Sequence, residues 1–210
     1  MTDNEIDGAT SAALLVVGFI PYIVGILRTR NLPPGHPDKI EPKKATWLIW
    51  SSNDIMAFAA MFVAGTAQWQ IGSAVFMAST LFTLSLLYGT RDWTWLDLTC
   101  ISLSVVAGFL WYIFNSPTVA IIMCMSILGL GTIPTAVSSW KTPEKEDLLT
   151  WVIFNISSIF GLMAVTDWYN PDKLAQPATF MVIDGIILGI LLLRRGWSKN
   201  NSINTVTEGE

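Results

Sequence analysis

The sequence predicts an all-α integral membrane protein with seven transmembrane helices, in which two parallel three-helix repeats are joined by one helix (a 3+1+3 layout). Hydrophobic residues make up 52% of the 210 residues and charged residues only 13%, whereas a soluble domain carries about 25% charged residues. The segment Thr46–Trp50 also returns as Thr150–Phe154. The same spacing of 104 residues relates similar side chains as far as Leu87 and Leu191.

The charged residues are concentrated between seven long apolar runs. A helix needs about 20 apolar residues to cross a hydrocarbon core about 30 Å thick. We expect helices because every backbone polar group must be satisfied internally in lipid. The predicted spans are Thr10–Leu27, Ala45–Gly65, Ile71–Gly89, Trp95–Asn115, Pro117–Trp140, Leu148–Val165 and Pro177–Leu193.

These spans divide the chain into five parts. Three spans reverse the direction of the chain, so one further span lets a second triplet insert in the same direction as the first. A second repeated segment, Gly18–Pro21 and Gly131–Pro134, has a spacing of 113 residues. We expect an extracytoplasmic tail at 1–9, a first repeat at 10–89, a linker helix at 90–115, a second repeat at 116–196 and a disordered cytoplasmic tail at 197–210.

Basic residues predict the orientation, because cytoplasmic loops of membrane proteins are enriched in Lys and Arg. Seven spans place eleven basic residues on one side and only Lys173 on the other. The N-terminus is therefore expected outside and the C-terminus inside, in a bacterial inner (plasma) membrane. The eleven residues are Arg28, Arg30, Lys39, Lys43, Lys44, Arg91, Lys141, Lys145, Arg194, Arg195 and Lys199.

Two acids lie inside the apolar runs, Asp54 in the second and Asp184 in the seventh. Such residues usually face a bundle interior or a water-filled cavity. No Lys, Arg or His lies at a matching depth, and burial without a cation favours the protonated form. Both acids are candidates for proton or cation coupling. The alternative is that they are hydrogen-bonded helix-packing residues.

One face of the second span carries two tryptophans and an acid at positions i, i+3 and i+7, and the sixth span repeats this spacing. Facing each other, these two surfaces would form an aromatic chamber with amide, hydroxyl and carboxylate groups. Alternatively, Trp47 and Trp151 are interfacial belt residues. The predicted solute-binding residues are Trp47, Trp50, Asn53, Asp54, Trp151, Phe154, Asn155 and Ser158.

Proline occupies equivalent positions in the first and fifth spans, at Pro21 and Pro134. Proline bends a helix because it removes a backbone hydrogen bond. We expect this pair to act as hinges near the inner membrane face, although proline kinks also occur in transmembrane helices that do not move.

Motifs for other functions are absent from the sequence. There is no phosphate-binding loop, HExxH motif, Cys/His cluster or basic stripe. We therefore expect no catalytic residue and no enzyme, no cofactor, no metal and no nucleic-acid partner. The expected partners are a small neutral or cationic solute and the lipid bilayer, and a homo-oligomer is left open.

The 3+1+3 layout, the outside N-terminus and the paired prolines resemble the SWEET/PQ-loop superfamily of small-solute transporters. Trp47-xx-Trp50-xxx-Asp54 is similar to the Trp-rich motif of the PnuC-type vitamin transporters. Thr46–Trp50 also resembles segments of small bacterial membrane proteins. The resemblance implies a transporter or facilitator with a central site between the repeats, with solute contacts at the matching positions. A non-transporting membrane receptor or sensor on the same scaffold is the alternative.

Overall fold

A computed structural model describes residues 2–34, 36, 38–91, 93–143 and 146–207. The side chains of Leu96, Pro134 and Ser138 and those from Arg195 onward are outside this description. Lys145, counted above among the basic residues, also lies outside the described residues.

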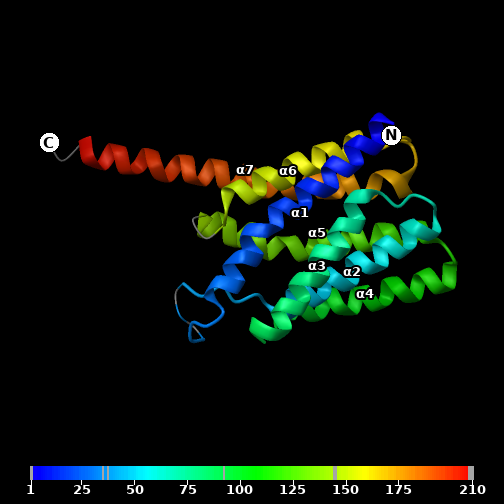
Figure 1. Cartoon of the computed structure of the whole chain (residues 1–210), viewed down its shortest axis with the longest axis horizontal. Coiled ribbons are helices and arrows are strands. Elements are labelled where there is room, and N and C mark those ends of the chain that lie inside the picture. The colour runs from blue at the N-terminus through cyan, green and yellow to red at the C-terminus, as the bar shows by residue number, and fades with distance from the viewer. Residues whose placement is uncertain (1, 35, 37, 92, 144–145, 208–210) are drawn as a thin grey trace.

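The described residues form seven α-helices and no strand, which confirms the all-helical class (Figure 1). Successive helices run in alternating directions, and the two termini lie at opposite ends of the bundle (Figure 1). The helices are α1 (Asp3–Thr29), α2 (Lys44–Val63), α3 (Trp69–Tyr88), α4 (Trp95–Phe114), α5 (Pro117–Lys141), α6 (Leu148–Met163) and α7 (Pro171–Thr207).

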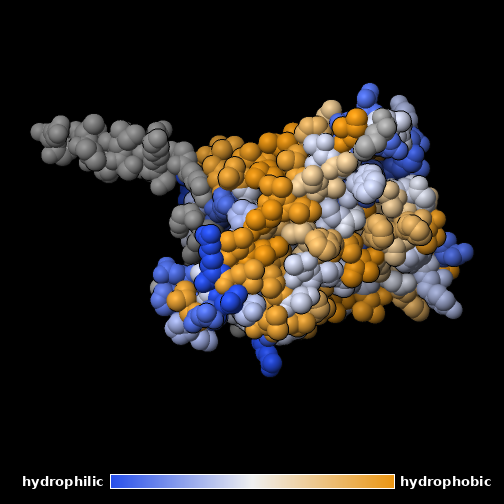
Figure 2. All heavy atoms as spheres, viewed as in Figure 1, coloured by the Kyte–Doolittle hydropathy of each residue, from blue (hydrophilic) through white to orange (hydrophobic). Residues whose placement is uncertain are grey.

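Among the described residues, five of these helices are long and apolar enough to cross a membrane, namely α1, α3, α4, α5 and α7. Sequence analysis counts seven. α2 has 20 residues, but its polar centre, which includes Asn53 and Asp54, lowers its mean hydropathy. α6 is apolar but has only 16 residues, or about 24 Å at about 1.5 Å per residue. Hydrophobic residues dominate the middle of the bundle, with hydrophilic ones at both ends (Figure 2).

Local capping explains where the helices begin. Thr2 and Glu5 form a capping box, so α1 begins at Asp3 and includes most of the segment expected as a tail. Thr94 and Asp97 form another at the start of α4. α7 continues to Thr207, where a disordered tail is expected from 197. The sequence from Ser198 to Thr207 contains neither glycine nor proline to end that helix.

Each half of the bundle uses the same pattern of packing. α1 packs against α3 and α5 packs against α7, while α2–α3 corresponds to α6–α7. Between the halves, α1 packs against α6 and α2 packs against α5. α4 packs against α5 and, to a smaller extent, α2, and its outer face leaves large apolar side chains such as Val105 exposed.

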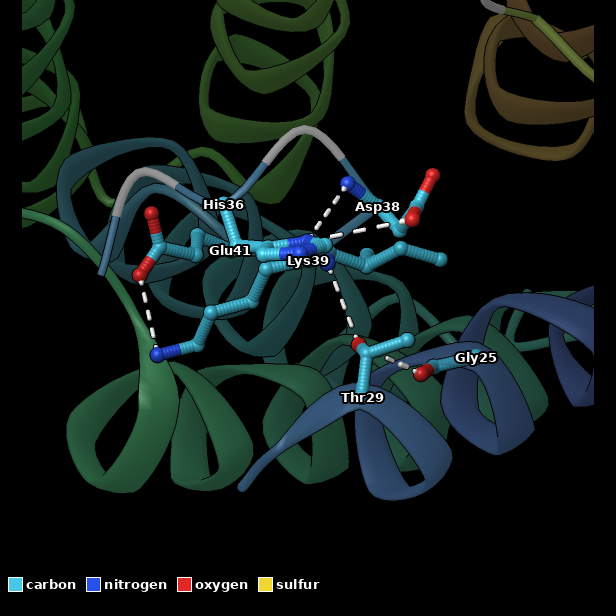
Figure 3. Close-up of polar contacts among 7 residues, drawn as sticks. Gly25, Thr29, His36, Asp38, Lys39 and Glu41 are labelled. Carbon is cyan, nitrogen blue, oxygen red and sulfur yellow. Dashed lines mark hydrogen bonds and ion pairs between the residues drawn. The ribbon is translucent and has the colours of Figure 1, made fainter. Parts of the chain in front are cut away.

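The loop between α1 and α2 is held on the ends of α1 and α3. Thr29 Oγ1 donates to the Gly25 carbonyl (2.8 Å) and accepts from the Ile40 N–H (3.1 Å). The Thr90 N–H donates to the Pro42 carbonyl (3.1 Å). Figure 3 shows the polar contacts around this loop, including the Asp38 N–H donated to His36 (3.2 Å) and the Lys39–Glu41 ion pair (3.2 Å).

Candidate functional site

A cavity lies between the two halves of the bundle, with walls from every helix except α4. Its free volume is about 60 Å³, whereas roughly 10–15 Å³ is enough for one water molecule. There is room for a few waters or a compact solute group. The lining residues are Leu15, Phe19, Trp50, Asp54, Ala74, Ala78, Leu128, Thr132, Trp151, Phe154, Phe180, Ile183 and Asp184.

Several lining residues come in pairs that share the sequence spacings. Leu15 and Leu128, and Phe19 and Thr132, are 113 residues apart, and Trp50 and Phe154 are 104 apart. Equivalent positions of the two halves therefore face the same space. The upstream spacing, applied to the whole of the first and fifth spans, is the signal that would have identified Leu15, Phe19, Leu128 and Thr132. Ala74, Ala78, Phe180 and Ile183 also line the cavity without having been predicted.

Both predicted acids line this cavity. The Ser158 hydroxyl donates to Asp184 Oδ2 at 2.6 Å. Asp54 is 3% exposed, and its Oδ1 is buried with no hydrogen-bond partner among the described residues. Sequence analysis places the two acids on helices of opposite halves and does not bring them together. The structure adds that α2 and α7 present both to one space.

The aromatic wall is continuous along one side of the site. Phe154 packs against Phe19 with ring centroids 4.8 Å apart and against Trp151 at 5.8 Å. The Trp151 indole N–H donates to Glu146 (3.1 Å). Trp47 does not line the cavity. It is buried against Phe19 at 6.2 Å and Trp50 at 5.7 Å, so it supports the wall from behind.

The predicted amides lie away from the cavity. Asn53 is buried and donates to the Cys124 carbonyl of α5 at 3.0 Å. Asn155 lies beside α7, where a Cβ at Gly185 would lie 3.6 Å from its Nδ2. Ser158 is fully buried and reaches the site through Asp184. Of the eight predicted solute contacts, the structure brings Trp50, Asp54, Trp151 and Phe154 to the cavity.

Two hydrogen bonds between the halves occupy related positions. Asn53 donates to the Cys124 carbonyl, and Ser157 Oγ donates to the Ser11 carbonyl at 2.8 Å. The donors are 104 residues apart and the acceptors 113, the two spacings found in the sequence. Backbone packing between α2 and α5 thus matches that between α6 and α1.

Sequence analysis does not identify the polar cluster around Ser157. Gln70 Nε2 donates to Ser157 Oγ (3.3 Å), and Gln176 Nε2 donates to Gln70 Oε1 (2.9 Å). Ser11, Gln70, Ser157 and Gln176 are all fully buried. The cluster joins α1, α3, α6 and α7 near the end of the bundle that holds the N-terminus.

The predicted hinges are not next to the cavity lining. Pro21 lies within α1 and is exposed. Pro134 falls within the range of α5, and its side chain is outside the described residues. The described residues contain no group of three or more His, Cys, Asp or Glu that could hold a metal ion.

No protein-family model, curated protein or solved structure matches this chain. The resemblance to the SWEET/PQ-loop superfamily therefore stays a prediction from the sequence.

Proposed function

We propose that this protein is a small-solute transporter or facilitator on a scaffold of the SWEET/PQ-loop type, and that the central cavity is its solute site. One observation carries the proposal. Residues from both halves, related by the sequence spacings, line a single cavity that also receives two acids. In membrane proteins built from repeats, substrate sites usually lie near the middle of the bilayer between the repeats.

The proposed topology has seven spans, with α1–α3 and α5–α7 inserted in the same direction and α4 as the linker. The matching packing pairs and the matched Asn53 and Ser157 bonds support it. In this topology α2 crosses the membrane despite its polar centre, because Ser51, Asn53 and Asp54 are buried inside the bundle. The distribution of basic residues supports an outside N-terminus in a bacterial inner membrane.

In the proposed mechanism, solute enters the cavity from one face and leaves from the other as the two halves rock against each other. Asp54 and Asp184 exchange a proton or bind a cation during this cycle. Pro21 and Pro134 bend α1 and α5. The aromatic wall of Trp50, Trp151 and Phe154 provides an apolar surface for the solute.

Uptake into proteoliposomes tests the proposal. The solute panel contains sugars, nucleosides, amino acids and amines, with and without a pH gradient. Ala78→Leu adds bulk inside the cavity, while Val105→Leu adds the same kind of bulk on the exposed face of α4. We expect flux of at least one solute above that of empty vesicles, lost in Ala78→Leu and kept in Val105→Leu. Equal flux in both variants would overturn the proposal.

A receptor or sensor on the same scaffold is the second candidate. The α1–α2 loop favours it because this loop has defined contacts to Thr29 and Thr90 and so presents a fixed surface to a partner. Saturable solute binding without flux, together with a protein partner crosslinked to residues 28–44, would support the receptor over the transporter.

A further inference from the structure

The charge of the central cavity is unbalanced. Asp54 and Asp184 both line it, and the described lining residues include no Lys, Arg or His. Asp184 has the Ser158 hydroxyl as a partner, whereas Asp54 Oδ1 has none among the described residues. A buried carboxylate is stabilised by a cation within a few ångströms. The vacant partner position of Asp54 therefore suits a positively charged group.

The rest of the wall is aromatic. Phe19, Trp50, Trp151, Phe154 and Phe180 all line the cavity. Aromatic faces attract cations, and walls of aromatic rings bind alkylated ammonium groups in particular, because these have a diffuse charge and an apolar surface. A carboxylate next to aromatic rings is thus chemically matched to an organic cation rather than to a strongly hydrated inorganic one.

The cavity offers few hydrogen-bond partners for a polyhydroxylated solute. Asn53 bonds to the α5 backbone and the Trp151 N–H bonds to Glu146. Besides the two acids and the Trp50 indole, Thr132 is the polar side chain among the described lining residues. A sugar buried here would leave most of its hydroxyl groups unsatisfied, at roughly 1–3 kcal/mol each.

We propose that the cavity binds a compact monovalent alkylammonium group, with its positive charge between the Asp54 and Asp184 carboxylates and its alkyl surface against Trp50, Trp151 and Phe154. This inference rests on the proposed function for the location of the site and assigns its substrate class. The free volume of about 60 Å³ suits a head group of this size.

The decisive comparison uses choline and 3,3-dimethylbutan-1-ol, which share a shape but differ in charge. Binding to the purified full-length protein is measured by calorimetry in potassium phosphate buffer, free of other amines. We expect saturable choline binding and an affinity at least about tenfold weaker for the neutral alcohol, a difference of about 1.4 kcal/mol. Equal affinities, or no binding of choline, would overturn the substrate class.

Matched variants locate the charge. Asp54→Asn should weaken choline binding at least about tenfold, and Asp54→Glu should restore part of it. Asp38→Asn removes one negative charge from the exposed α1–α2 loop and should leave binding unchanged. Trp50→Leu should weaken choline binding more than Trp50→Phe does, since only the latter keeps an aromatic face. Unchanged binding in Asp54→Asn, with the Asp38→Asn protein as reference, would contradict the proposal.

The outcomes separate this inference from the proposed function. Flux of a neutral solute that is blocked by Ala78→Leu, without choline binding, would reject the alkylammonium class and keep the transporter. Choline binding that depends on Asp54, without flux of any solute in the panel, would keep the class and reject transport.

Discussion

The two halves of the bundle share their packing but differ in the side chains that face the cavity. Asn53 and Ser157 make related hydrogen bonds between the halves. At the site itself, Asp54 corresponds to Ser158 and Phe19 to Thr132. Contacts that join helices are therefore similar in the two halves, whereas groups that could meet a solute are not. The difference indicates a symmetric scaffold around a polar, asymmetric site.

The acids illustrate this asymmetry. Each half contributes one, but from non-equivalent helices, with α2 supplying Asp54 and α7 supplying Asp184. Asp184 is bonded to Ser158, the residue at the position related to Asp54. One carboxylate is thus held by its own half, while the other has an unpartnered oxygen. We expect the two acids to contribute unequally to function.

The largest expected effect comes from the unpartnered acid. Asp54→Asn should lower uptake driven by a pH gradient at least about tenfold, because the amide removes the charge that binds a cation or proton. Asp184→Asn should have a smaller effect, since an amide oxygen can still accept from Ser158. Uptake into proteoliposomes with an imposed pH gradient measures both. Unchanged flux in both variants would eliminate coupling through these acids.

The next effect compares two glycines 113 residues apart. A Cβ at Gly18 would lie 2.7 Å from Phe154 Cδ1, whereas a Cβ at Gly131 would lie 3.6 Å from Trp50 Nε1. Gly18→Ala should therefore displace Phe154 and cost about 1–3 kcal/mol. Gly131→Ala should change stability by less than about 1 kcal/mol. Denaturant unfolding in mixed micelles measures both free energies, and equal costs would show that the two halves pack alike at this point.

A smaller effect separates the two hydrogen bonds between the halves. Ser157→Ala should cost about 1 kcal/mol, because its hydroxyl bonds to both the Ser11 carbonyl and Gln70. Asn53→Leu should cost less than about 0.5 kcal/mol, because it also removes the buried, unpartnered Asn53 Oδ1. The same unfolding measurement applies. A larger cost for Asn53→Leu would contradict this ranking.

The smallest effect concerns the ends of the halves. Arg194 lies 5.1 Å from the Trp140 ring centroid and donates to its carbonyl, while Thr90, 104 residues earlier, is held by main-chain bonds to Pro42 and Lys44. Arg194→Ala should cost about 0.5 kcal/mol. Thr90→Ala keeps the main-chain bonds and should be nearly neutral. A comparable loss in Thr90→Ala would show that its side chain matters.

Much of the fold is predictable from the sequence because long apolar runs leave a chain little choice but helices. The seven runs correspond to the seven helices in order. Their ends are less predictable. α1 starts earlier because Thr2 and Glu5 cap it, and α2 falls below the apolarity of a typical span because its polar face is inside the bundle.

The site is predictable only in part, because the rotation of each helix depends on its neighbours. The i, i+3, i+7 face correctly groups Trp50 with Asp54 on the cavity. Asn155 follows Phe154 by about 100° of helix rotation and turns toward α7 instead. Nothing in the sequence fixes α7 so that Asp184 meets Asp54, because that juxtaposition comes from packing between α6 and α7 and across the two halves.

The central claim, that both halves surround one solute cavity, is tested most directly by thiol labelling. Leu15→Cys and Leu128→Cys place one thiol in each half, in a protein with Cys100→Ala and Cys124→Ala, and Val105→Cys on α4 is the reference. We predict that a trimethylammonium methanethiosulfonate reagent modifies both cavity thiols faster than the α4 thiol, and that added Ala78→Leu slows both. Labelling of only one cavity thiol, or slowing of only one by Ala78→Leu, would contradict a shared cavity.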